Sequence, residues 1–125
     1  MLEGFVPFDF SEGMPYVSIT RNGLTFNQSV VKKLGCPAYV VFLINEETKQ
    51  IAIQACEAFY PNATAFYRPK KSGTMSVRWN SRDLMRNVTH LMQWDLDKES
   101  YKAEGLFLRD EQAIIFDLSK ATAIN

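Results

Sequence analysis

The chain has 125 residues, of which 46% are hydrophobic and 13% aromatic, and its 14 basic and 14 acidic side chains cancel to a net charge of zero. Frequent aromatic residues and only two cysteines exclude a disordered chain, a collagen-like repeat and a disulfide-rich scaffold. No apolar run approaches the ~20 residues of a membrane span, and the first four residues lack the features of a signal peptide. We therefore expect a single cytoplasmic domain over residues 1–125, with no membrane association.

A β-hairpin is predicted near the start of the chain. Residues 16–20 alternate between apolar and polar side chains, which is typical of a half-buried strand, and residues 24–26 form a second short run. Arg21-Asn22-Gly23 connects the two runs. Asn-Gly at such a connection indicates a hairpin, because both turn positions must tolerate a positive φ.

A short helix and a second hairpin follow. Asn27 is positioned to cap a helix over residues 28–34, and Gly35 is positioned to end it. The runs at 39–44 and 50–55 flank a polar turn, so we expect them to pair. The first half therefore has the order hairpin, capped helix, hairpin.

The second half repeats this order. Its predicted elements are two strands around a turn, a helix capped by Asn80 or Ser81, and a final hairpin, over residues 65–68, 74–79, 82–93, 101–108 and 112–118. The stretch at 24–27 is similar to that at 77–80, and the stretch at 50–53 to that at 112–115.

Internal repetition of this kind decides the whole fold. We predict a β-rich α+β fold in which tandem hairpin–helix–hairpin units, about 14–56 and 65–121, form one compact barrel-like domain with a pseudo-two-fold axis. The alternative is an ordinary α+β domain whose two halves share an order of elements by chance.

The stretch from Gly23 to Gly35 resembles the strand–turn–helix signature of the swapped-hairpin DNA-binding domains of the AbrB, MazE and SpoVT group. Members of that group pair as dimers whose hairpins interleave into one barrel. The resemblance therefore implies an internal pseudo-dimer with a DNA-binding role in transcription regulation. The chain departs from the family pattern at the helix, where Asn27 replaces the usual Pro and Val31-Lys32 replace a pair of arginines. Gly23 also replaces an arginine of the turn, with Arg21 nearby.

Basic side chains are unevenly distributed although the net charge is zero. Residues 68–86 contain six bases and one acid, whereas residues 95–117 contain seven acids and three bases. Arg82, Arg86 and His90 are spaced four residues apart, so they share one helix face. A basic stripe beside a basic turn is typical of phosphate contact. The alternative is a solvated face whose charges pair with the acids that follow the helix. The residues predicted to position DNA phosphates are Arg21, Lys32, Lys33, Arg68, Lys70, Lys71, Arg78, Arg82 and Arg86.

Residues suited to catalysis or metal binding are few. His90 is the single histidine, and Cys36 and Cys56 lack the second Cys-x-x-Cys pair of a structural zinc site, so both are expected to be buried thiols. The acidic turn at 95–99 lacks the glycine and glutamate of a calcium loop. We therefore expect no enzyme activity, no metal and no cofactor.

Non-catalytic binding of double-stranded DNA is the leading hypothesis. The alternative is a protein-interaction module in which the basic face docks an acidic protein and the aromatic residues Phe5, Phe8 and Phe10 add hydrophobic contact. Either role is compatible with a monomer or a homodimer.

Overall fold

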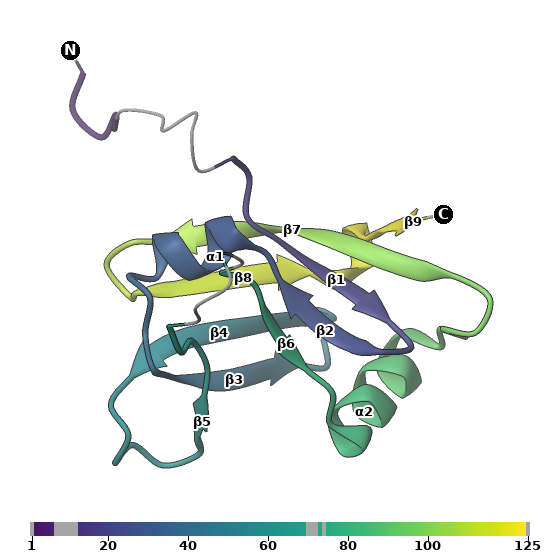
Figure 1. Cartoon of the computed structure of the whole chain (residues 1–125). Coiled ribbons are helices and arrows are strands. Elements are labelled where there is room, and N and C mark those ends of the chain that lie inside the picture. Colours follow the sequence, from purple (N-terminus) through teal and green to yellow (C-terminus); the bar gives the residue numbers. More distant parts are fainter. Residues whose placement is uncertain (1, 7–12, 70–72, 74, 125) are drawn as a thin grey trace.

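A curled antiparallel sheet dominates the computed structural model, which describes residues 2–6, 13–69, 73 and 75–124. In chain order the elements are β1 (Tyr16–Thr20), β2 (Gly23–Phe26), α1 (Gln28–Lys33), β3 (Tyr39–Asn45), β4 (Gln50–Cys56), β5 (Ala63–Ala65), β6 (Val77–Trp79), α2 (Arg82–Met92), β7 (Ser100–Leu108), β8 (Ala113–Asp117), the 3-10 helix η1 (Leu118–Lys120) and β9 (Thr122–Ile124). The strand order is β5-β3-β4-β8-β7-β1-β2-β6, and β9 also pairs with β7. Figure 1 shows the sheet curling into a half-barrel. The prediction of a β-rich, barrel-like fold is therefore confirmed.

The prediction of two tandem hairpin–helix–hairpin units is wrong, because the first hairpin of the second unit does not form. β5 pairs with β3, where Thr64 lies opposite Val40. β6 pairs instead with β2, where Arg78 lies opposite Thr25. After β5, the Phe66 and Tyr67 amides donate to the carbonyls at positions 38 and 37, so the chain continues along the segment before β3 instead of turning back. β5 and β6 are therefore the first and last strands in the strand order.

The β1–β2 hairpin forms as predicted, but its turn differs. Gly23 already pairs with Thr20, so the connection consists of Arg21 and Asn22 alone. Neither of these two residues has a positive φ, whereas Gly23 has a φ of +128°. The glycine is therefore required one position later than the Asn-Gly turn pattern implies.

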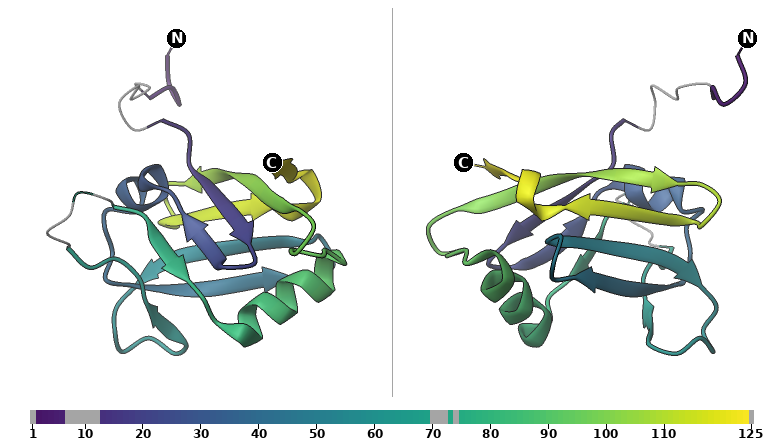
Figure 2. Two further views of the ribbon diagram at one scale, coloured as in Figure 1. Left: turned by 45° about the vertical axis from the view of Figure 1, so that its right-hand side comes forward. Right: turned by 180° about the vertical axis from the view of Figure 1, so that it is seen from behind.

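The two α-helices lie at opposite ends of the half-barrel (Figures 1 and 2). Because β2 and β6 run antiparallel and each leads directly into a helix, the chain enters α1 and α2 at opposite ends. Asn27 caps α1 as predicted, and its Oδ1 accepts from the Val30 amide at 3.2 Å. The same oxygen accepts from the Tyr16 amide at 3.0 Å, and Nδ2 donates to the Met14 carbonyl at 2.9 Å. Ser81 caps α2, accepting from the Leu84 amide at 3.3 Å.

The hydrophobic core fills the concave side of the sheet. Phe26 on β2 is fully buried, and its ring centroid lies 5.0 Å from that of Trp79, 5.6 Å from Phe66 and 5.8 Å from Phe116. Burying a side chain of this size contributes about 2 kcal/mol. Further large and fully buried side chains are Ile19, Leu24, Ile51, Ile53, Ile114 and Leu118.

Candidate nucleic-acid interface

Helix α2 presents a basic face to solvent. Val88 is fully buried on the opposite face of the helix, and Leu84 and Met85 pack against the core. Arg82 and Arg86 lie one helical turn apart and are both exposed, as the sequence spacing predicts. The packing of the apolar face therefore directs both guanidinium groups away from the protein.

The two arginines of α2 have no acidic partner in the described part of the chain. Acids of the following loop bond locally instead: Asp95 accepts from the Asp97 amide at 3.0 Å, and Glu99 accepts from the Tyr101 hydroxyl at 3.0 Å. Pairing of the helix bases with these acids, which was the alternative explanation of the stripe, therefore finds no support among the described residues.

The β1–β2 turn reaches the end of the half-barrel from which α2 starts (Figure 1). A Cβ built on Gly23 would lie 2.2 Å from the Trp79 carbonyl oxygen and 3.2 Å from the Asn80 Cα. Arg21, two residues earlier in the same turn, is exposed. The fold thus brings Arg21 from the first half of the chain to the end of the molecule that carries Arg82.

Arg78 connects this region to a groove at the open side of the half-barrel. Its Nε donates to the Thr25 hydroxyl at 3.2 Å across the β2–β6 pair, and the side chain is exposed. The groove has a volume of about 480 Å³ and is lined by Phe42, Thr64, Arg78, Trp79, Asn80, Ser81 and Leu84. Trp79 Nε1 donates to the Ala65 carbonyl at 3.2 Å, which links β6 to β5 across this groove. The sequence indicates only a helix-capping role for Asn80 and Ser81. It contains no pattern that places β3 and β5 beside these two residues.

The remaining predicted bases lie elsewhere. Lys32 and Lys33 belong to the last turn of α1, at the other end of the half-barrel, and both are half-buried. Arg68 is exposed and follows Tyr67, whose amide donates to the Pro37 carbonyl, so it lies near the exit of α1. The bases of the two ends are not brought together on one face. Lys70 and Lys71 lie outside the described residues, as do Phe8 and Phe10.

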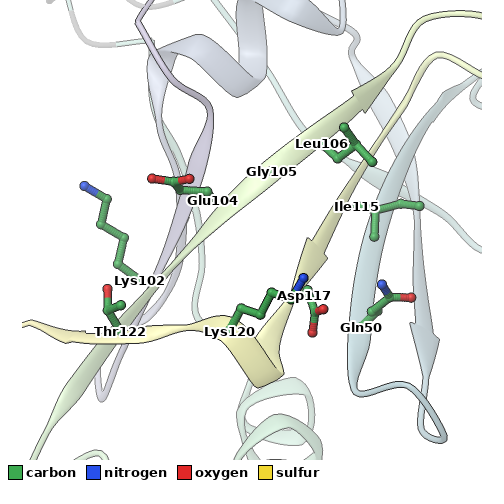
Figure 3. A pocket seen from close by; sticks show the side chains of 9 residues that line it. All are labelled: Gln50, Lys102, Glu104, Gly105, Leu106, Ile115, Asp117, Lys120 and Thr122. Atoms are coloured by element: carbon green, nitrogen blue, oxygen red, sulfur yellow. The ribbon is translucent and has the colours of Figure 1, made fainter.

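A second hollow lies on the far side of the sheet and has no excess of positive charge. Figure 3 shows its lining, which consists of Gln50, Lys102, Glu104, Gly105, Leu106, Ile115, Asp117, Lys120 and Thr122. Its volume is about 550 Å³. The two lysines are balanced by two carboxylates, and the Lys102 Nζ lies 4.1 Å from the centre of the Tyr16 ring. None of the predicted phosphate contacts lines this hollow.

Groups suited to catalysis are dispersed among the described residues. Cys36 is exposed and Cys56 is half-buried, so the expectation that both thiols are buried is wrong for Cys36 and holds only in part for Cys56. Burial raises the pKa of Cys56, and the neighbouring Glu57 carboxylate raises it further. The pKa of Tyr101 is also raised, first by burial and then by its hydrogen bond to Glu99. The described part of the chain contains no cluster of three or more histidine, cysteine or acidic side chains that could hold a metal ion.

Comparison of the chain with protein-family models, with curated proteins and with solved structures finds no significant match. Among the described helices, none is long and apolar enough to cross a membrane.

Proposed function

We propose that this protein binds double-stranded DNA without catalysis, through a surface that we call the α2 face. The α2 face consists of Arg21, Arg78, Arg82 and Arg86. The observation that carries the proposal is the position of Arg82 and Arg86, which are exposed one turn apart and have no acidic partner in the described chain. Guanidinium groups form charge-assisted hydrogen bonds with phosphate oxygens, often two at once.

The number of arginines sets the expected salt dependence. Each neutralised phosphate contributes about −0.9 to the slope of log K against log salt, so four contacts correspond to a slope of about −3.6. Between 50 and 200 mM salt, such a slope lowers the affinity about 150-fold. Contacts of this kind position the protein on the duplex and carry little sequence information.

We also propose that the half-barrel is an internal pseudo-dimer of the swapped-hairpin type, with interleaved strands in place of tandem hairpins. Strand pairing supports this proposal. The exchange of the two halves swaps β1 with β5, β2 with β6, β3 with β7, and β4 with β8. Under it, the pair of β1 with β7 becomes the pair of β5 with β3, and the pair of β3 with β4 becomes the pair of β7 with β8. The pair of β2 with β6 and the pair of β4 with β8 are unchanged. Two described pairs have no described counterpart: the β1–β2 pair, and the β7–β9 pair, whose strand β9 is outside the exchange. The exchange also relates α1 to α2, since each helix follows directly after the exchanged strands β2 and β6.

The proposal is tested by fluorescence anisotropy of a labelled duplex against salt concentration. We expect the double variant Arg82→Ala/Arg86→Ala to weaken binding at 50 mM salt and to reduce the magnitude of the slope by about 1.8. Arg109→Ala is the matched control, because Arg109 is exposed in the turn between β7 and β8 and outside the α2 face. Absence of binding at ~10 μM protein and 50 mM salt would contradict the proposal, given typical non-specific affinities.

An acidic protein that docks on the same α2 face is the second candidate. The division of the predicted bases between the two ends of the half-barrel favours it, because four arginines on one face are fewer than the six to ten phosphate contacts of strongly salt-dependent DNA-binding proteins. A partner recovered by the folded protein after nuclease treatment, and lost with Arg82→Ala/Arg86→Ala, would identify this function instead.

A further inference from the structure

The convex face of the sheet carries a continuous apolar row, which we call the outer row. In the strand registers, Leu43 lies opposite Ala52, Ala52 opposite Ile115, and Ile115 opposite Leu106. The row therefore crosses β3, β4, β8 and β7 without a polar residue. Successive residues of a strand point to opposite faces of the sheet. In an antiparallel sheet with one face in water, the residues on that face are therefore normally polar.

The described helices leave this face uncovered. α1 and α2 lie at the ends of the half-barrel, and the view from behind in Figure 2 shows β3, β4, β8 and β7 with neither of these two helices over them. Leu106 is 63% exposed and Leu43 is 44% exposed. The inward neighbours Ile51 and Ile114 are at most 1% exposed. The outer row is thus a second apolar surface, separate from the core.

We propose that a second copy of this chain covers the outer row. Two sheets can pack face to face with nearly aligned strands. If a two-fold axis runs parallel to the strands between β4 and β8, Leu43 meets Leu106 of the second copy, and Ala52 meets Ile115 of the second copy. By symmetry, the small side chain of Ala52 then faces the larger Ile115 side chain of the other copy at two equivalent places. A hollow of about 170 Å³ already lies there, lined by Leu43, Ile44, Asn45, Gln50, Ile51, Ala52 and Ile115.

The polar residues beside the outer row fit the same arrangement. Two residues farther along the strands lies another row on the same convex face, in which Asn45 lies opposite Gln50 and Gln50 lies opposite Asp117. The two-fold axis places Gln50 opposite Asp117 of the second copy, so an amide donor faces a carboxylate and no like charges meet. The hollow at this side also contains both lysines and carboxylates (Figure 3), a mixture that favours a self-complementary contact over a polyanion or a lipid surface.

The test is the mass of the full chain in solution, measured by sedimentation equilibrium over a range of concentrations. One chain has a mass of 14.3 kDa, and we expect the wild type to approach twice this value as concentration rises. Leu106→Asp should give the mass of one chain, because it places two carboxylates in an apolar contact. Leu2→Asp is the matched control, since Leu2 is 74% exposed and lies outside the outer row. Far-UV circular dichroism and thermal denaturation establish that each variant is folded.

A second pair of variants tests the orientation of the two copies. Gln50→Glu places a carboxylate opposite Asp117 of the second copy at two positions, so we expect the dissociation constant of the dimer to rise about tenfold. Gln50→Lys should lower it. A wild-type chain that stays at the mass of one copy up to ~100 μM overturns the proposal, as does a dimer that persists in Leu106→Asp. An equal effect of the two Gln50 variants overturns the proposed axis. None of these measurements involves the α2 face, so they are independent of DNA binding.

Discussion

Replacement of Gly23 by alanine tests how the β1–β2 turn is joined to the start of α2. The new Cβ would lie 2.2 Å from the Trp79 carbonyl oxygen and 3.0 Å from its carbonyl carbon, which are backbone atoms of the paired strand β6. Because backbone cannot rotate away as a side chain can, the β2–β6 pair must separate locally. Gly23 also has a φ of +128°, which alanine rarely adopts.

The magnitude follows from these two costs. The unfavourable φ costs about 1–2 kcal/mol, and the loss of one or two strand hydrogen bonds costs about 1 kcal/mol each, so the free energy of unfolding should fall by about 3 kcal/mol. For a chain of this length, 1 kcal/mol corresponds to a shift in Tm of about 4 °C, which gives a fall of about 12 °C.

Gly35→Ala is the matched control for this substitution. Gly35 has a φ of +82°, but a Cβ there would meet no atom within 4 Å. In this variant the unfavourable φ is therefore the only cost, and the free energy of unfolding should fall by about 1 kcal/mol, which corresponds to a fall in Tm of about 4 °C. Urea denaturation and thermal melts of both variants give the comparison. Equal losses of stability in the two variants would refute the close contact between Gly23 and Trp79.

Two further predictions concern local contacts. Asn27→Ala removes three hydrogen bonds, two of which join α1 to the segment at 14–16, and should lower the free energy of unfolding by about 2–3 kcal/mol, against about 1 kcal/mol for Ser81→Ala. Equal losses in urea denaturation would mean that the bonds to this segment add no stability. A thiol reagent near pH 8 should modify Cys36 before Cys56, because Cys36 is exposed while the raised pKa of Cys56 keeps its thiol protonated to higher pH. Since the folded pKa of Cys56 lies above its unfolded value, its contribution to stability is present at lower pH and is lost as the pH rises through the folded pKa. Modification of Cys56 first, identified with single Cys→Ser variants, would contradict this order.

Local sequence signals were sufficient for most of the elements. Alternation of apolar and polar residues located β1, runs of strand-forming residues on either side of a turn located the other strands of the hairpins β1–β2, β3–β4 and β7–β8, and the cap residue Asn27 located the start of α1. Helix α2 begins at the predicted residue, with Arg82 and Arg86 on its solvent face. These features depend on residues close together in the chain, so their pattern is present in the sequence itself.

Tertiary structure alone decided the pairing of the short strands and the grouping of the charges. β5 and β6 have three residues each, too few for an alternating pattern to indicate their partners, and both pair with strands of the first half of the chain. The antiparallel pairing of β6 with β2 sends α1 and α2 to opposite ends, which separates Lys32 from Arg82. The outer row likewise exists only through the registers among β3, β4, β8 and β7, because register between distant strands is set by burial of their shared inner face and has no local signature.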